Sequence, residues 1–415
     1  MRGNLVYHPS VTRGGIKEDG ESRETARAKR DFVSPVVKDV PPSGIRKFFD
    51  LIARTKGVIS LGVGEPDFTT PWHIREACVY SLEQGRTTYT SNAGAPELRR
   101  AIAVDLQRRH GLEYDPEGEI LVTVGVSEGV DLALRAVICP GDEVIVPEPC
   151  FVSYKPCVAF AGGRAVAVPL RSSEDFKLRV EDLEPYLTPR TKVLMICYPN
   201  NPTGAIMTRE DLEPIAELAR EYDLLVVSDE IYGELTYGGE HVSIASLPGM
   251  KERTILLDGF SKAYAMTGWR LGYAAGPAEI LSAMTKIHQY AVMCAPTMAQ
   301  MAAVEALEHG EEEKRKMIEQ YQRRRRLVLN GFRDMGLPCF EPLGAFYIFP
   351  SIAPTGLTSE EFAQRLLEEE KVAVVPGTAF GGSGEGYIRC SYATSVENLT
   401  EALARIKRFV GSVVQ

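Results

Sequence analysis

Residues 254–276 read TILLDGFSKAYAMTGWRLGYAAG, in which two short apolar runs, TILLDGF and LGYAAG, flank one lysine and one arginine. Both runs are bounded by small or turn-forming residues, which is typical of buried β-strands. Lys262 follows the first run almost directly, and Arg270 comes just before the second. Ligands of open α/β sheets bind beside the carboxyl ends of strands. The stretch therefore predicts both part of a sheet and a site at its edge.

Four earlier apolar runs extend this pattern and alternate with helix-like segments. They are EILVTVG (119–125), DEVIVPEP (142–149), KVLMICYP (192–199) and LLVVSDE (224–230). Near-continuous apolar strands indicate a sheet that is covered on both faces. The alternation of strands and helices predicts an α/β fold with a mostly parallel sheet.

Two helix starts are marked by side chains. Thr208 with Asp211, and Thr358 with Glu361, have the spacing of a capping box, in which each side chain bonds the other residue's backbone N–H. We expect helices to begin at both places.

The chain divides into four parts by composition. Residues 1–32 are polar and charged, which predicts a flexible tail. Residues 33–60 are expected to form the N-terminal segment of a smaller domain, residues 61–300 the larger domain, and residues 301–415 the rest of the smaller, α+β domain. One face of the last predicted helix carries the apolar residues Leu399, Leu403, Ile406 and Val410.

Composition excludes several classes of protein. The 415 residues carry a formal net charge of −9, which argues against a nucleic-acid partner. No apolar run approaches the roughly 20 residues that span a bilayer, and the N-terminus lacks a leader pattern, so we expect a cytoplasmic protein. The eight cysteines form no CxxC pair, so buried free thiols are expected and no metal site is predicted.

Lys262 and Asp229 each allow two interpretations. A desolvated lysine beside a strand end can form an imine with a carbonyl cofactor, whereas an isolated surface lysine needs no such role. Asp229 ends the apolar run LLVVSD, with Tyr232 three residues beyond. It is either a helix N-cap or the partner of a buried cation.

Four further residues have side chains that could bind an anion or donate a hydrogen bond to a ligand. Asn201 lies in the turn sequence YPNNPTGA, which is either a plain loop or a source of an amide donor. Ser127 follows a strand and a glycine at the start of a predicted helix, where backbone N–H groups can bind phosphate. Arg270 could clamp the same phosphate. Arg389, inside the apolar run YIRCSYA, is either half of an ion pair or a fork for a substrate carboxylate.

The four consecutive arginines at 323–326 lie in a long, charged helical stretch. A phosphate-binding patch is one reading, and a solvated helix face is the one we favour.

Several of these segments together closely resemble the class I and II aminotransferases of fold type I, which depend on pyridoxal 5′-phosphate. The resemblance is strongest to the aspartate and aromatic aminotransferase branch and extends from about Ser43 onward. It rests on SLGVGEPDFTTP, YTSNAGAPELR, PGDEVIVPEPCFVSY, YPNNPTGA, SDEIY, SKAYAMTGWRLGY, GAFYIFP and YIRCSYA, in this order. It implies a mostly parallel, seven-stranded sheet between helices, with a smaller α+β domain.

The resemblance also implies roles around the cofactor ring. Lys262 would hold pyridoxal phosphate as a covalent imine, and Asp229 would pair with the pyridinium nitrogen. Asn201 and Tyr232 would hydrogen-bond the ring 3-oxygen, with Tyr232 counted among the catalytic residues. Phe151 matches the aromatic position that stacks on the ring. In such enzymes the peptide bond after Asn201 is often cis.

Further implied roles concern the phosphate and the substrate. The phosphate would be bound by Val126, Ser127, Ser261 and Arg270. Arg389 would bind the substrate α-carboxylate, helped by the backbone of Gly64 and by Asn201. Tyr89 matches a tyrosine that reaches the phosphate of the neighbouring subunit, so a homodimer with shared active sites is expected.

The expected reaction moves an amino group from an L-amino acid to a 2-oxo acid such as 2-oxoglutarate by a ping-pong mechanism. Some aspartate-specific relatives carry a lysine near the position of Ser127, and a serine cannot replace that charge. An aromatic, alanine-like or broad amino donor is therefore at least as plausible as aspartate. Lyases and decarboxylases on the same fold, and a pyridoxal-binding regulator, are the alternatives; the regulator would need a DNA-binding module ahead of residue 43.

Overall fold

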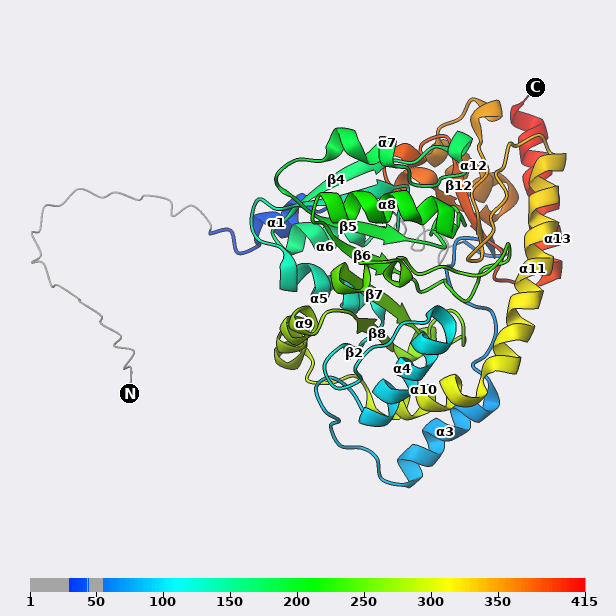
Figure 1. The fold of residues 1–415 in the computed structure, drawn as a ribbon. Coiled ribbons are helices and arrows are strands. Elements are labelled where there is room, and N and C mark those ends of the chain that lie inside the picture. Colours follow the sequence, from blue (N-terminus) through cyan, green and yellow to red (C-terminus); the bar gives the residue numbers. More distant parts are fainter. Residues whose placement is uncertain (1–29, 43, 45–54, 415) are drawn as a thin grey trace, which may run out of the picture.

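A computed structural model of the chain describes residues 30–42, 44 and 55–414. Its centre is a seven-stranded sheet with the strand order β2-β8-β7-β6-β5-β3-β4 (Figure 1). The strands are β2 Ile120–Thr123, β3 Glu143–Glu148, β4 Arg164–Pro169, β5 Thr191–Cys197, β6 Leu225–Asp229, β7 Thr254–Gly259 and β8 Gly272–Ala275. All neighbours pair in parallel except β8, which is antiparallel to both β2 and β7. The predicted α/β fold with a mostly parallel sheet is confirmed.

The inner strands of the sheet carry apolar side chains on both faces, because helices pack against each face. Along β5, Val193 and Met195 pack into one hydrophobic cluster, whereas Leu194 and Ile196 pack into another. The first cluster takes in the helix after β2, and the second takes in the helix before β6. Successive strand residues point to opposite faces, so a continuous apolar run is what a doubly covered strand requires.

The helices are spread along the whole described chain. They are α1 Pro35–Asp39, α3 Trp72–Glu83, α4 Pro96–His110, α5 Val126–Val137, α6 Tyr154–Phe160, α7 Val180–Leu183, α8 Arg209–Glu221, α9 Ala278–Ala291, α10 Thr297–His309, α11 Glu311–Asp334, α12 Ser359–Glu370 and α13 Val396–Val413. Both predicted capping boxes are present, at Thr208 before α8 and at Thr358 before α12. Within the described ranges, none of these helices is both long and apolar enough to cross a bilayer.

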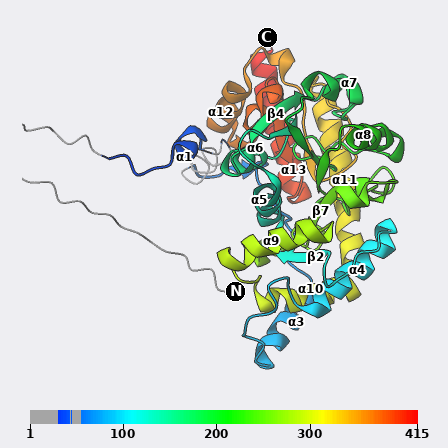
Figure 2. The same cartoon turned by 60° about the vertical axis from the view of Figure 1, so that its left-hand side comes forward.

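Two small sheets lie outside the central one and join distant parts of the chain. β1 Ile59–Ser60 pairs with β10 Val372–Ala373. β9 Tyr347–Ile348, β11 Val375–Pro376 and β12 Ile388–Ser391 form the other sheet. The long helix α11 runs beside α13 at this end of the molecule (Figures 1 and 2). Residues near 60 thus meet the C-terminal part, while the exact domain limits stay a prediction.

The final helix α13 buries Leu399, Leu403, Ile406 and Val410, as predicted. The arginine run at 323–326, in contrast, was wrongly read as wholly solvated. Arg324 and Arg325 are only 8% and 5% exposed. They pair with Asp67 and Glu341 at 2.7 and 2.8 Å. Of the predicted tail, only residues 30–32 are described, so its flexibility stays a prediction.

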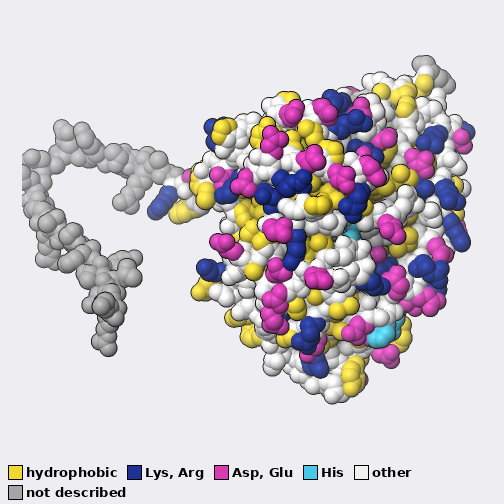
Figure 3. Space-filling view, in the orientation of Figure 1, with side chains coloured by type: hydrophobic (Ala, Val, Ile, Leu, Met, Phe, Trp, Pro, Cys, Tyr) yellow, Lys and Arg dark blue, Asp and Glu magenta, His cyan; other side chains and the backbone are white. Residues whose placement is uncertain are grey.

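One strand of the central sheet was missed. β4 is the edge of the central sheet, and its residues are mostly exposed or half-buried. It therefore lacks the continuous apolar run that marks the inner strands. On the face in Figure 3, acidic and basic side chains are interspersed, with no large patch of one sign.

Candidate active site

A cavity of about 370 Å³ opens where the strands of the central sheet end. It gathers every predicted site residue except Tyr89. Those residues are Gly64, Val126, Ser127, Phe151, Asn201, Asp229, Tyr232, Ser261, Lys262, Arg270 and Arg389. Tyr89 lies in an exposed loop with 78% of its surface accessible, away from this cavity.

Strand direction explains why these residues meet. β6 ends at Asp229, and the turns after β5 and β7 carry Asn201 and Lys262. Parallel strands end at one edge of a sheet, so the three side chains share that edge. β8 runs the other way and begins two residues after Arg270, which brings that arginine to the same edge.

The Lys262 side chain is partly buried, and its amine is held inside the cavity rather than at the surface. Its Nζ donates to the carbonyl oxygen of Gly64 at 2.7 Å. Burial lowers the pKa of Lys262 to about 8; Arg389 and Arg270 push the pKa in the same direction, and Glu65 opposes them. About a tenth of this amine is thus uncharged at pH 7, far more than for an ordinary lysine, which suits a nucleophile or a base.

Asp229 is buried without a cationic partner among the described residues. Its Oδ2 accepts a hydrogen bond from the Tyr154 hydroxyl at 2.7 Å, and its Oδ1 accepts one from the Ile231 N–H at 3.2 Å. Burial raises the pKa of this carboxyl to about 6. A cation placed beside it would lower that pKa again, so the position suits the partner of a cationic ring nitrogen. No helix follows directly, so the N-cap interpretation is wrong.

The start of α5 forms a polar cradle with Arg270. Gly125, the residue before the helix, has φ of 75°, and a Cβ there would lie 2.6 Å from Nη2 of Arg270. The backbone N–H groups of a first helical turn have no partner within the helix. The hydroxyls of Ser127 and Ser261 make no hydrogen bond within the described residues. Amides, hydroxyls and a guanidinium facing one space are the donor set that a phosphate needs.

Arg389 is 2% exposed, yet none of the carboxylates in the described chain pairs with it. Its Nη1 donates to Oδ1 of Asn201 at 2.9 Å and its Nη2 to the carbonyl of Gly62 at 2.7 Å. Its Nε is buried and has no partner among the described residues. The ion-pair reading of Arg389 is therefore wrong. A buried guanidinium with a free donor is costly unless an anion joins it, so the position suits a carboxylate ligand.

The aromatic wall includes two tyrosines that the sequence alone did not single out. Tyr154 supports Asp229, and its ring lies edge-on to Phe151, with 5.6 Å between ring centroids. The hydroxyl of Tyr347 lies 2.8 Å from that of Tyr232. No signal in the motifs could have found these contacts, because each joins segments far apart in the chain.

The turn that carries Asn201 differs from one expectation. The bond between Asn201 and Pro202 is trans, whereas Glu148–Pro149 and Tyr198–Pro199 are cis. Asn201 is buried, and its amide oxygen accepts a hydrogen bond from Arg389, so this turn forms part of the cavity wall; its role as an amide donor stays a prediction.

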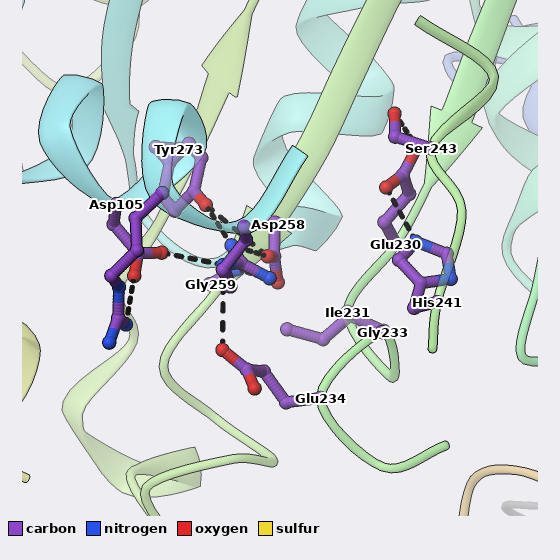
Figure 4. Close-up of polar contacts among 12 residues, drawn as sticks. Asp105, Glu230, Ile231, Gly233, Glu234, His241, Ser243, Asp258, Gly259 and Tyr273 are labelled. Atoms are coloured by element: carbon purple, nitrogen blue, oxygen red, sulfur yellow. Dashed lines mark hydrogen bonds and ion pairs between the residues drawn. The ribbon is translucent and has the colours of Figure 1, made fainter. Parts of the chain in front are cut away.

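A second polar network lies behind the cavity (Figure 4). The carboxylate of Glu230, next to Asp229, accepts hydrogen bonds from Ser228, Ser243 and His241 at 2.9, 2.7 and 2.7 Å. These bonds are strong enough to outweigh burial, which alone would raise the pKa of Glu230; the pKa falls to about 2, with His241 the largest lowering influence.

A separate polar group in the same view centres on Asp258, the residue before the glycine that ends β7. Its Oδ2 accepts from Arg109 at 2.8 Å, and Arg109 also pairs with Asp105 at 2.7 Å. The Tyr273 hydroxyl donates to Asp258 at 3.2 Å. Two separate sets of hydrogen-bonded side chains, one around Glu230 and one around Asp258, thus fix the strand ends that present Asp229 and Lys262.

Together, the fold and the cavity define a class of enzyme: an α/β protein with a reactive lysine, a buried carboxylate and an anion cradle at one sheet edge. Comparison with known proteins gives the family. The family model for aminotransferase class I and II matches residues 56–406. The chain belongs to this family and is a pyridoxal-phosphate-dependent aminotransferase.

Individual relatives agree over nearly the whole chain. The aspartate aminotransferase of Pyrococcus abyssi is 50% identical over 372 residues, which cover 89% of this chain and 96% of the relative. Aromatic-amino-acid aminotransferase 2 of Thermococcus litoralis is 48% identical, with the same two coverages of 89% and 96%. Among solved structures, the Thermus thermophilus aspartate aminotransferase with maleate has a TM-score of 0.87 at 43% identity, covering 91% of this chain and 100% of that one.

The cavity fits pyridoxal phosphate on its own chemistry. An amine with a lowered pKa would suit the aldehyde, a buried carboxylate without a cation would suit the ring nitrogen, and the cradle at α5 would suit the phosphate. Asn201 and Tyr232, on the same wall, have groups that can bond a ring oxygen.

Proposed function

We propose that three residues carry the chemistry of this aminotransferase. Lys262 binds the cofactor covalently and acts as the base, Asp229 pairs with the cofactor's ring nitrogen, and Arg389 binds the substrate carboxylate. The observation that carries the proposal is that all three residues line one cavity. Within the described residues, Asp229 has no cationic partner and the Nε of Arg389 has no hydrogen-bond acceptor, and a cofactor and a substrate could supply these. Val126, Ser127, Ser261 and Arg270 bind the phosphate in this scheme. Phe151 stacks on the ring, and Gly64 lies where its backbone meets both Lys262 and the substrate.

Each residue then acts at a stated atom. Pyridoxal phosphate supplies the electron sink for the bond that breaks at the amino acid's α-carbon. Arg389 holds the α-carboxylate through its planar donors, and Asn201, bonded to Arg389, keeps that plane in place. The Lys262 amine, freed by the incoming substrate, takes up the α-proton, and its lowered pKa makes it a base at neutral pH. Asp229 would keep the ring nitrogen protonated, and Tyr232 would hydrogen-bond the ring oxygen.

We further propose an amino donor with a neutral side chain, preferably aromatic, and a 2-oxo acid such as 2-oxoglutarate as acceptor. In the described chain the cations of the cavity are Lys262, Arg270 and Arg389, and all three are assigned above. Its wall also carries the acidic Glu65 and the apolar Ile231 and Phe151. Among the residues that the structure describes, no cation of the cavity is thus left to bind a side-chain carboxylate. The relatives are named for aspartate or for aromatic amino acids, so the framework itself serves both classes.

A panel of amino donors tests this proposal. Phenylalanine, tyrosine, alanine and aspartate are each supplied with 2-oxoglutarate, and the new 2-oxo acid is measured. We expect kcat/KM for the aromatic donors to exceed that for aspartate by about 10-fold or more. In the Ser127→Lys variant, aspartate should gain about 10-fold relative to phenylalanine, because a cation now faces the cavity. Aspartate as the best donor of the unmodified chain would overturn the donor class, and carbon dioxide or ammonia without a 2-oxo acid would favour a decarboxylase or lyase.

We also propose a cytoplasmic homodimer in which Tyr89 completes the partner's site. The support is the exposure of large aromatic side chains near this loop: Tyr89 is 78% and Tyr290 86% accessible in the single chain. Eight free cysteines fit a reducing compartment. Sedimentation should give a dimer. Tyr89→Phe should weaken cofactor binding but leave the dimer intact. A fully active monomer would contradict the shared site.

A further inference from the structure

Tyr347 contacts both Tyr232, which is assigned to the cofactor, and Arg389, which is assigned to the substrate. No role has been assigned to Tyr347 itself. It is the first residue of β9, in the small sheet that also contains Arg389 on β12. Tyr232 lies just beyond β6 of the central sheet. Tyr347 is 1% exposed and lines the cavity, so its contacts are with the site itself.

The ring of Tyr347 is one side of a clamp on Arg389. The guanidinium carbon lies 4.4 Å from the centroid of Tyr347 and 4.7 Å from that of Phe380. Two aromatic faces attract the cation and prevent it from rotating. The ring therefore helps to fix the direction in which Arg389 presents its free donor.

The hydroxyl of Tyr347 has a different partner. It lies 2.8 Å from the hydroxyl of Tyr232 and makes no other hydrogen bond within the described residues. Space for it is left by Gly64, because a Cβ at that position would overlap the Tyr347 hydroxyl. The Gly64 carbonyl meanwhile accepts from Lys262. The missing side chain at Gly64 thus lets the two tyrosines and the lysine approach one another.

Either hydroxyl of the pair can be the donor, and the two directions leave the spare proton on different residues. Burial raises the pKa of both tyrosines, so both hydroxyls keep their protons near neutral pH. The pair has two protons and one mutual hydrogen bond, which leaves one proton to be donated elsewhere. If Tyr232 gave its proton to Tyr347, Tyr232 would have no proton left to donate to a ring oxygen of the cofactor. If Tyr347 donates, the remaining proton belongs to Tyr232, whose ring centroid is 5.7 Å from the Lys262 amine.

We propose that Tyr347 is a positioning residue that donates its hydroxyl proton to Tyr232 and so strengthens the hydrogen bond that Tyr232 gives to the cofactor's ring oxygen. A donor that itself accepts a hydrogen bond becomes a stronger donor. The same side chain orients Arg389 through its ring. The inference rests on the proposed roles of Tyr232 and Arg389, and it adds a residue that joins them.

The hydroxyl and the ring can be tested separately. The readout for the hydroxyl is the pKa of the pH-dependent visible absorbance of the bound cofactor, measured without substrate. Tyr347→Phe should raise this pKa by about 0.5 to 1 unit, because a weaker donor stabilises the ring oxygen anion less. Tyr232→Phe should raise it at least as much. The double variant should shift no further than Tyr232→Phe alone, because the hydroxyl of Tyr347 acts through Tyr232.

The readout for the ring is KM. Tyr347→Phe keeps the ring and should leave KM for the amino donor nearly unchanged, whereas Tyr347→Leu should raise it about 3- to 10-fold. Tyr392→Phe is the matched control, because Tyr392 is equally buried and donates to the carbonyl of Ala345, outside the cavity. Neither the absorbance pKa nor KM should change in that variant.

The possible results separate this inference from the proposal beneath it. A pKa shift in Tyr232→Phe without one in Tyr347→Phe would overturn the inference and leave the role of Tyr232 standing. An unchanged pKa in both variants would overturn both. A shift in Tyr392→Phe as large as that in Tyr347→Phe would also overturn the inference, since any loss of a buried hydroxyl would then have the same effect.

Discussion

Asp229 and Glu230 are adjacent carboxylates, both buried, and their surroundings move their pKa values in opposite directions. Asp229 faces the cavity with one tyrosine hydroxyl and one backbone N–H, and burial raises its pKa to about 6. Glu230 faces the back of the sheet with two serines and a histidine; there the pKa falls to about 2 although burial opposes the fall. The cavity therefore contains groups that await a partner, and the network behind it contains groups that already have theirs.

The difference teaches how this fold separates function from stability. Leaving a buried charge unpaired costs folding free energy and creates a binding site. Pairing a buried charge with hydrogen bonds fixes the backbone that carries the site. If this separation is real, substitutions on the two sides should affect different measurements.

The largest effect is expected at Asp229. Asp229→Asn keeps the shape but removes the negative charge that would hold a protonated ring nitrogen. We expect kcat to fall about 10²- to 10³-fold, with little loss of thermal stability, because the lost charge had no cationic partner in the protein. Steady-state kinetics and thermal melts of the cofactor-free protein check this. An Asn variant that melts much earlier yet turns over normally would reverse the comparison.

Arg389 should come next. Arg389→Lys keeps the charge but loses the planar fork, so kcat/KM should fall about 10²-fold, mainly through KM. Arg365→Lys is the control, because Arg365 lies outside the cavity, where it pairs with Glu369 and lies over the ring of Phe409. Equal kinetics for the two variants would show that the fork of Arg389 is not what binds the substrate.

Behind the sheet, Glu230→Gln should act on stability. Gln cannot accept all the hydrogen bonds of the carboxylate, and the buried donors left behind should cost about 2 kcal/mol. Kinetic constants at a temperature well below the melting point should stay within about threefold. Urea unfolding measures the first and donor kinetics the second. A kcat loss as large as that of Asp229→Asn would mean that the two sides are not separate.

The smallest effect concerns pH. The pKa of Lys262 is lowered, so its free amine grows as pH rises through about 8 and is nearly complete above it. The rate at which cofactor-free protein recombines with pyridoxal phosphate should rise about tenfold from pH 7 to 9 and then level off. An ordinary lysine would keep gaining up to pH 10 and beyond. Because Glu65 raises this pKa, Glu65→Gln should move the midpoint to lower pH; a midpoint that moves upward would contradict the assignment.

The sequence predicted the inner strands and most of the cavity because both depend on local patterns. An apolar run that ends in Asp229 or in a turn with Lys262 fixes strand, edge and side chain together. What it missed depends on distant partners. Arg324 and Arg325 look solvated until Asp67 and Glu341 reach them.

Edges and hydroxyl contacts were missed for related reasons. β4 is half-exposed, so it has no continuous apolar run. The bonds from Tyr154 to Asp229 and between Tyr347 and Tyr232 span 75 and 115 residues, and no local motif encodes such a pairing. The role of Tyr89 stays a prediction, because it depends on a second chain.

The central claim is that the amine of Lys262 binds the cofactor covalently. Cofactor-saturated protein is reduced with borohydride and digested, and the peptides are mapped by mass spectrometry, with Lys262→Ala protein as the control. The account predicts a phosphopyridoxyl group on Lys262 and none in the control. A label on another lysine, or an unlabelled Lys262 in saturated protein, would contradict it.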